Sequence, residues 1–299
     1  MMPDDGLRIL SGFEAIFLGA VGFPSVPDHI SLWGLLIPIR RGFDQYINLR
    51  PVKILQGIES PLRKYQAGDV DFVVIRENTE GEYSNAGGSL RTGTPDEVVI
   101  QNSIFTRMGT ERVMRYAFEL ARRSKKRLTA ATKSNGINYS MPFWDRVFRE
   151  VSQDFPDVVP TLTHVDALAS FFVTRPETFD VVVASNLFGD ILTDLGGAIQ
   201  GGLGLAAAAN INPNRTMPSM FEPVHGSAPD IAGQNIANPV AQIWTAKLML
   251  DHLGYQEEGQ WIMDAIEKTL TAGIKTPDLG GSATTRSVTD AVLERLPKS

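Results

Sequence analysis

The chain has 299 residues, 43% hydrophobic and 21% charged, a composition typical of a globular protein with two domains or one large domain. It has no cysteine, which excludes disulfides, zinc–thiolate centres, iron–sulfur clusters and a cysteine nucleophile, so a bound metal must use oxygen or histidine ligands. The net charge of −6 argues against a nucleic-acid partner, and because no segment reads as a signal peptide or as a membrane span, we expect a cytoplasmic protein without a membrane partner.

Short β-rich runs alternate with amphipathic stretches along the first two thirds of the chain. The predicted strands are 15–21, 46–55, 71–78, 127–134, 158–166 and 179–188. The clearest helix is 110–123, with Thr110 as its cap, and the last third is helical over 239–254, 256–272 and 287–296. This order predicts an α/β fold with a largely parallel sheet. Neither a GxGxxG fingerprint nor a Walker A motif follows any predicted strand.

Two aspartates lie four positions apart in NLFGDILTDLGG, residues 186–197. On a helix, Asp190 and Asp194 share one face, where like charges repel. A helix start could explain Asp190, which would then accept backbone N–H bonds in the first turn. It does not explain Asp194, whereas a hard divalent cation such as Mg²⁺ or Mn²⁺ would turn the repulsion into attraction.

Three arginines lie in or beside early predicted strands: Arg40 in PIRRGF, Arg50 in YINLRPVK and Arg76 in FVVIREN. Each guanidinium can bind a carboxylate through two parallel hydrogen bonds, so three converging arginines suit a substrate with two carboxylates. Pairing with surface acids remains the alternative for any one of them. Arg76 ends an apolar strand, and the carboxyl ends of strands are where ligands bind in α/β sheets.

Lys133 and Asp166 also lie at the ends of predicted strands, and Tyr83 follows Arg76 through ENTEGEY. A lysine beside other cations in a partly desolvated site can exchange protons near neutrality. The alternatives are a surface or core position for Lys133 and Tyr83, and helix capping for Asp166.

The most distinctive segment is FEPVHGSAPDIAGQNIANP, residues 221–239. Its small residues expose backbone N–H groups, and Asp230 could accept hydrogen bonds from both hydroxyls of a ribose while repelling a 2′-phosphate. A structural loop in which Asp230 caps a helix is the alternative.

Together these segments resemble the isocitrate/isopropylmalate dehydrogenase family, the metal-dependent β-decarboxylating dehydrogenases of 2-hydroxy acids. The resemblance covers essentially the whole chain, and its motifs are INLRP, IRENTEGEYS, TKSN, VDALA, NLFGDILTDLGG and EPVHGSAPDIAGQNIANP. It implies the family's two-domain α/β fold, with residues 1–45 plus 201–299 in a large cofactor-binding domain and 46–200 in a small domain that carries the dimer interface. It also implies a homodimer in which Lys133 and Asp166 reach the neighbouring subunit's site.

The resemblance further implies roles for individual residues. Arg40, Arg50 and Arg76 would hold substrate carboxylates, and Asp166, Asp190 and Asp194 would bind Mg²⁺ or Mn²⁺. Lys133 would remove the hydroxyl proton through a relay, and Tyr83 would protonate the enol carbon after decarboxylation. Contacts with an NAD cofactor would come from His225, Gly226, Ser227, Ala228, Asp230 and Asn238, and the pair Asp230 and Ile231 is similar to the NAD-using members.

The stretch VPDHISLWGLLIPIRR resembles the tartrate and D-malate branch of the family. It offers Trp33, Leu36 and Ile37 where isocitrate enzymes place polar groups, and we expect the Trp33 ring to fill the space of a larger substrate tail. The alternative is 3-isopropylmalate, whose alkyl group also suits an apolar pocket. Family members begin with a strand and a GDGIG-like turn that this chain lacks, so the resemblance implies a missing N-terminal part. An inactive truncated paralogue that acts as an oligomer partner is the second alternative.

Overall fold

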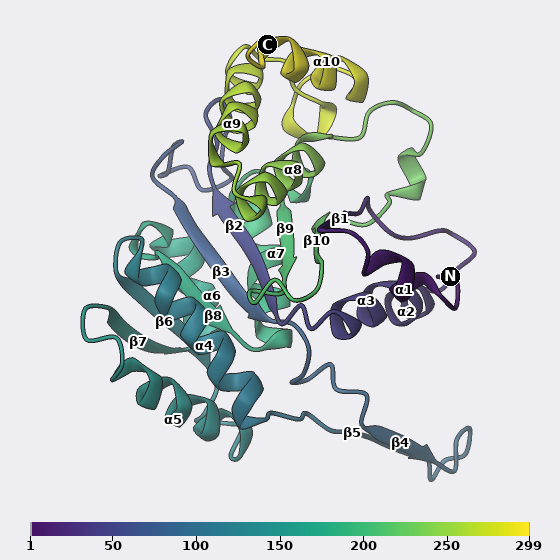
Figure 1. Ribbon diagram of the computed structural model, residues 1–299, viewed down its shortest axis with the longest axis vertical. Coiled ribbons are helices and arrows are strands. Elements are labelled where there is room, and N and C mark those ends of the chain that lie inside the picture. Colours follow the sequence, from purple (N-terminus) through teal and green to yellow (C-terminus); the bar gives the residue numbers. More distant parts are fainter. Residues whose placement is uncertain (1, 299) are drawn as a thin grey trace.

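The computed structural model describes residues 2–298, which form one eight-stranded sheet with helices on both faces and a separate two-stranded hairpin (Figure 1). The strands of the large sheet are β1 Ala15–Phe17, β2 Ile47–Lys53, β3 Asp71–Glu77, β6 Arg127–Thr132, β7 Val159–His164, β8 Val181–Ala184, β9 Ala207–Ile211 and β10 Ser219–Pro223. The hairpin consists of β4 Gly87–Leu90 and β5 Val98–Gln101, and it projects away from the body of the molecule (Figure 1).

The helices fall into groups along the chain. Near the N-terminus lie α1 Gly6–Leu10, α2 Asp28–Ser31, a π-helical turn Leu32–Leu36 and α3 Ile37–Gly42. The middle of the chain forms α4 Arg107–Arg122, α5 Ser140–Ser152, α6 Val165–Thr174 and α7 Asn186–Ile199. The last three are α8 Val240–Leu253, α9 Gln256–Thr271 and α10 Thr285–Arg295, which gather beside β9 and β10 (Figure 1). Three-residue 3₁₀ turns occupy Pro176–Thr178, Leu203–Leu205, Pro229–Ile231 and Pro277–Leu279.

The sheet is mixed, in the order β1-β10-β9-β2-β3-β8-β6-β7. The pairs from β3 through β8 and β6 to β7 are parallel, as is β1 with β10, whereas β2 runs antiparallel to both β3 and β9. Strands β9 and β10 are antiparallel as well, so the prediction of a largely parallel sheet is right for the β3 to β7 part and wrong for the pairs that β2 and β9 make. The antiparallel register places Asn48 opposite Arg76 and Arg50 opposite Val74.

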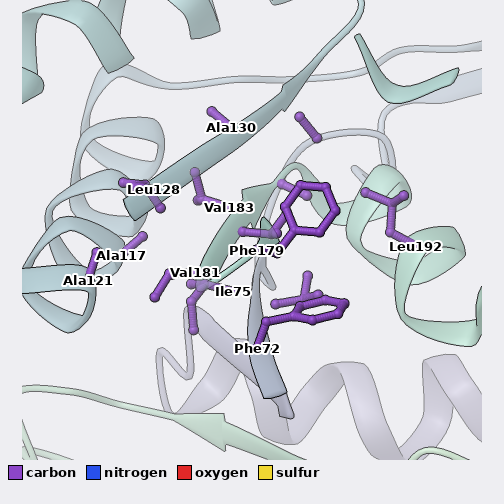
Figure 2. Packing of buried hydrophobic residues seen from close by; sticks show 14 of the residues in the cluster. Phe72, Ile75, Ala117, Ala121, Leu128, Ala130, Phe179, Val181, Val183 and Leu192 are labelled. Carbon is purple, nitrogen blue, oxygen red and sulfur yellow. The ribbon is translucent and has the colours of Figure 1, made fainter. Parts of the chain in front are cut away.

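The main core lies on both faces of the β2 to β7 strands. Ala117 and Ala121 of α4 pack on one side of the strands, and Leu192 of α7 lies on the other (Figure 2). Phe72 and Phe179 fill the α7 side, with ring centroids 5.7 Å apart. A second cluster, which includes Trp244 and Ile266, lies among α8, α9 and α10.

All six predicted strands and all four predicted helices are present, with shifted ends. The helix expected at 110–123 starts at Arg107, and its cap is Thr106, whose side chain accepts a hydrogen bond from the Gly109 N–H. The prediction that Thr110 caps this helix is wrong, because Thr110 lies buried within the first turns. The sequence analysis missed four strands: the exposed β4 and β5, and the buried β9 and β10.

Close packing of α7 against β2 depends on Gly196. A Cβ at this position would lie 2.6 Å from Cγ2 of Val52, a stiff β-branched side chain. The helix that carries Asp190 and Asp194 can therefore approach the sheet only with glycine at this contact.

We expect Gly196→Ala to lower the free energy of unfolding by about 1–3 kcal/mol, because the added methyl overpacks the contact with Val52. Urea denaturation would measure the change. Gly88→Ala is the matched control, since a Cβ there meets nothing within 4 Å, and it should shift stability by less than about 0.5 kcal/mol. Equal stability of the two variants would contradict this packing.

Candidate active site

Helix α7 presents one continuous face to the site. It begins at Asn186, after Ser185, so Asp190 is its fifth residue and lies beyond the helix start. The interpretation of Asp190 as a capping residue is therefore wrong. Asn186, Asp190 and Thr193 are spaced by four and three residues and share one face.

A strap of residues 77–83 holds the N-terminus of α7. The Glu82 carboxylate accepts hydrogen bonds from the Ser185 hydroxyl at 2.7 Å and the Leu187 N–H at 3.1 Å, so it caps the helix from outside. Glu80 does the same for α4, accepting from the N–H of Thr106 at 2.9 Å and from its hydroxyl at 2.8 Å. One loop thus fixes two helix starts relative to the end of β3.

Two buried arginines, Arg50 and Arg76, lie against the face of α7. Asp190 pairs with Arg76 directly and with Arg50 at 3.5 Å, and Thr193 accepts from Arg50 at 2.5 Å. Burial and the charge of Arg76 lower the pKa of Arg50 to about 9, and burial also lowers the pKa of Arg76. Two guanidinium groups removed from water in this way gain from an anion placed between them.

The carboxylates of α7 differ in what surrounds them. Burial alone would raise the pKa of Asp190, but Arg76 and Arg50 hold it below its ordinary value, and the Tyr83 hydroxyl donates to Asp190 at 2.9 Å. Partial removal from water raises the pKa of Asp194, with Asp190 adding to the rise and Arg50 opposing it. Among the described side chains, none forms a hydrogen bond or a salt bridge with the Asp194 carboxylate, and a divalent cation would supply a partner.

Arg40 lies on α3 and has a buried anionic partner in this chain. Its Nη2 donates to Glu222 at 2.7 Å, and the Asn210 amide donates to the same oxygen at 2.7 Å. The side chains of Asn48 and Asn78 donate in turn to Asn210 at 2.9 and 3.0 Å. The alternative of a surface acid is wrong for Arg40, because Arg40 and Glu222 are only 12% and 7% exposed.

A cavity of about 200 Å³ brings the predicted substrate residues together. Its wall is lined by the side chains of Leu32, Leu36, Ile37, Arg40, Arg41, Arg50, Arg76, Asn78, Tyr83, Asn186, Asp190 and Val224. Trp33 does not line it: the residue is 36% exposed, and its ring centroid lies 5.2 Å from the Arg41 guanidinium. The expectation that Trp33 fills the substrate space is therefore wrong, and Leu32 and Leu36 form that wall.

Lys133 and Asp166 lie outside this cavity and pair with each other at 3.0 Å. This contact lowers the pKa of Asp166. Asp166 lies in the first turn of α6, where hydrogen bonds from the N–H groups of Asp166 and Ala167 lower its pKa further, as expected for a carboxylate that caps a helix start. Among the described side chains, no group of three Asp, Glu or His residues could hold a metal, so Asp166 does not join Asp190 and Asp194 in one chain.

The loop after β10 lines a second cavity, of about 500 Å³, which contains five of the six predicted cofactor residues: His225, Gly226, Ser227, Ala228 and Asn238. The sixth, Asp230, is exposed and is not among the lining residues. A small cavity of about 110 Å³ joins the two sites, since it shares Arg40 and Arg50 with the arginine cavity and His225 and Gly226 with the loop cavity.

Two side chains of the loop cavity, those of His225 and Asn238, are held in orientations that suit a polar ligand. The Nδ1 of His225 lies 2.9 Å from the Gly226 carbonyl oxygen and so carries the hydrogen, while Nε2 is buried without a partner among the described residues. The Asn238 amide is held at both ends, donating to Asp278 at 3.0 Å and accepting from the Val240 N–H at 3.0 Å. Both side chains are thus oriented before any ligand binds.

The sequence analysis missed several residues of this site. These are Glu80, Glu82, Asn186, Thr193, Asn210 and Glu222. A signal existed for Asn186 and Thr193, which lie at helical spacing from Asp190 in NLFGDILTD. Asn210 and Glu222 had no such signal, because the strands that carry them were not predicted.

The fold and the joined cavities define an α/β enzyme with a basic site for a small anion beside a site for a larger ligand. A family model for isocitrate/isopropylmalate dehydrogenase matches residues 1–292. The chain therefore belongs to this family, and it is a dehydrogenase that acts on a CH–OH group.

Comparison with individual relatives shows which members of the family the chain resembles. The chain is 60% identical to a probable tartrate dehydrogenase/decarboxylase from Bacillus subtilis, over 100% of this chain and 84% of the relative. It is 57% identical to the decarboxylating D-malate dehydrogenase of Escherichia coli, over 98% of this chain and 83% of that protein. The crystal structure of isocitrate dehydrogenase from Methylococcus capsulatus superposes with a TM-score of 0.88 at 34% identity, over 98% of this chain and 85% of that one. Among the described residues, no helix is both long and apolar enough to cross a membrane.

Because Asp190 and Asp194 have contrasting environments, we expect their replacement by asparagine to change the free energy of unfolding in opposite directions. In metal-free buffer at pH 7, Asp190→Asn should lower the free energy of unfolding by about 2 kcal/mol, because it weakens charge-assisted bonds to Arg76 and Arg50. Asp194→Asn should raise it, because a poorly compensated charge is removed. Urea denaturation with a chelator present would measure both changes.

The pH dependence follows from the pKa directions. The folded-state pKa of Asp190 is lowered, so its contribution is complete above the ordinary value near 4 and disappears as the pH falls through the folded value. The folded-state pKa of Asp194 is raised, so the gain from Asp194→Asn should vanish in acid. Changes of the same sign in both variants would contradict these assignments.

Proposed function

We propose that the chain oxidises a small 2-hydroxy dicarboxylic acid such as tartrate or D-malate, with or without loss of CO₂, and uses NAD⁺ and a divalent cation, Mg²⁺ or Mn²⁺. The observation that carries this proposal is the row of joined cavities from the arginines and Asp190 to the His225 loop. It would place a dicarboxylate beside a dinucleotide. The names of the relatives support the substrate class.

The chain's own residues supply binding and proton transfer. Arg40, Arg50 and Arg76 would bind and orient the two carboxylates. Burial and Asp190 raise the pKa of Tyr83, so its hydroxyl keeps its proton at neutral pH and can deliver it to carbon after decarboxylation. Lys133 would accept the substrate's hydroxyl proton through a water or hydroxyl relay.

The side chains of the site suit a divalent cation and NAD⁺. Asp190 and Asp194 offer hard oxygen ligands one helical turn apart, and Asp166 of a second chain would complete the set. When bound, the cation would stabilise negative charge on the substrate oxygen as a Lewis acid, and NAD⁺ would accept the hydride. Asp230, which lies in the sequence between the lining residues Ala228 and Ile231, would receive the adenosine ribose. The homodimer and the division into domains 1–45 plus 201–299 and 46–200 belong to the same proposal.

One observation favours a different substrate. Leu32, Leu36, Ile37 and Val224 give the arginine cavity an apolar wall that would also accept the alkyl group of 3-isopropylmalate. These four side chains are apolar, so a third carboxylate directed at this wall, as in isocitrate, would have no partner there, and an unpaired buried charge is strongly unfavourable.

The deciding experiment compares kcat/KM of the Mn²⁺-supplied protein for D-malate, tartrate, 3-isopropylmalate and isocitrate, each with NAD⁺ and NADP⁺. We expect D-malate or tartrate to exceed isocitrate by at least about tenfold. NAD⁺ should be preferred, because Asp230 would repel a 2′-phosphate. Preference for 3-isopropylmalate would establish the alternative substrate. Binding of NAD⁺ without turnover of any acid would favour the inactive paralogue.

Shared active sites predict complementation between inactive variants. In a mixture of Lys133→Met and Asp190→Asn chains, each mixed dimer would contain one intact site of two, so random assembly should restore about a quarter of wild-type activity. Co-refolding of the two variants followed by an NADH assay would test this.

The pair Lys133→Met and Asp166→Asn is the matched control. These two side chains contact each other at 3.0 Å and would enter the same neighbouring site, so their mixture should stay inactive. Recovery in the control, or none in the first mixture, would rule out this sharing.

A further inference from the structure

Asn186 holds the guanidinium of Arg76 at the edge of the arginine cavity. Its side-chain carbonyl oxygen accepts from Nε of Arg76 at 3.0 Å and from Nη2 at 2.8 Å. Its Nδ2 donates to the Glu80 carbonyl oxygen at 2.9 Å. Both Asn186 and Arg76 are 4% exposed, so these bonds lie almost entirely out of water.

The bonding pattern fixes which end of the amide faces which group. A guanidinium only donates and a backbone carbonyl only accepts, so the oxygen of Asn186 must face Arg76 and its nitrogen must face Glu80. The Arg76 stem passes over Gly189, where a Cβ would lie 2.6 Å from the Arg76 Cβ. With Nε and one hydrogen of Nη2 engaged by Asn186, Nη1 is directed to Asp190.

Judged only by its hydrogen bonds and its place at the start of a helix, position 186 would suit a carboxylate better than an amide. The first helical turn favours negative charge, and aspartate, of nearly the same shape, would bind the same edge of Arg76 more strongly. It would also neutralise Arg76, which already shares Asp190 with Arg50. A neutral oxygen orients the guanidinium and leaves its charge in place.

We propose that Asn186 is a positioning and specificity-determining residue: its uncharged oxygen fixes the Arg76 fork while preserving the positive charge that a dicarboxylate needs. The proposal rests on the proposed function in one respect, namely that the arginine cavity receives a dicarboxylate. Glu222 already compensates Arg40, and Arg50 and Arg76 share the single carboxylate of Asp190, so Arg76 is one of the cations, with Arg50 and Arg41, whose charge attracts the ligand.

The test compares Asn186→Asp and Asn186→Ala in the Mn²⁺- and NAD⁺-supplied protein. We expect Asn186→Asp to raise the KM for D-malate by about tenfold or more, the larger effect of the two, because a full charge is added beside Arg76. In both variants kcat should stay within about threefold and the KM for NAD⁺ within about twofold. Asn214→Asp, which adds the same charge on an exposed turn, is the control and should match the wild type.

A second measurement does not depend on turnover. Malonate, a dicarboxylate without a hydroxyl group, should raise the thermal midpoint of the wild type and of Asn214→Asp, but not that of Asn186→Asp. If malonate stabilises these proteins as expected while D-malate is not oxidised, the proposed function fails and this inference stands. Absence of any malonate effect on the wild type would overturn the inference.

The variants also separate charge from hydrogen bonding and from a purely structural role. A KM for Asn186→Asp equal to the wild type would mean that any acceptor suffices, and the proposal would be wrong. Losses of kcat and thermal stability in parallel, with KM unchanged, would indicate a structural role only. If Asn186→Asp does not fold, the split between KM and kcat in Asn186→Ala decides in the same way.

Discussion

The structure depends on the contact between two buried arginines and one face of α7. Arg50 and Arg76 come from antiparallel strands, are almost fully removed from water, and weaken each other's charged form. Asp190 offsets this cost from between them, while Asn186 and Thr193 hold the outer edges of the two guanidinium groups. Helix, sheet and site are therefore one unit, because displacement of α7 would leave two cations buried without partners.

Two sets of contacts connect this unit to the rest of the fold: the strap of residues 77–83, and the hydrogen bonds that Glu222 accepts from Arg40 and Asn210. Glu80 and Glu82 tie the end of β3 to the N-termini of α4 and α7. The turn that follows Arg76 therefore also fixes the position of α7, and with it that of Asp190, relative to the sheet. Arg40 of α3 donates to Glu222 of β10, and Asn210 of β9 donates to the same carboxylate, so these bonds connect α3 to β9 and β10. The His225 loop leaves the sheet at the end of β10. The arginine cavity and the loop cavity thus share a rigid support, which is what a reaction between two bound ligands needs.

Sequence periodicity predicted the elements whose apolar patterns are strong. The runs around Phe72 and Val182 are rich in β-branched and aromatic residues, and α4 repeats its buried positions with helical spacing. β9 was missed because AAANI is mostly alanine, which does not favour strands; it is buried only because β2 and β10 flank it. The cap at Thr106 was not predicted, because local sequence does not show that Glu80 reaches Thr106 from another loop.

The sequence by itself determined the family, the set of charged residues and the face of α7 on which the two aspartates lie, because these follow from composition, motif order and helical spacing. The tertiary structure alone decided their partners: that Arg40 pairs with Glu222, that Leu32 rather than Trp33 lines the cavity, and that Lys133 and Asp166 lie apart from Asp190 within one chain. The physical reason is that contacts between residues on different elements, such as Arg40 and Glu222, depend on strand order and register. No local pattern encodes those.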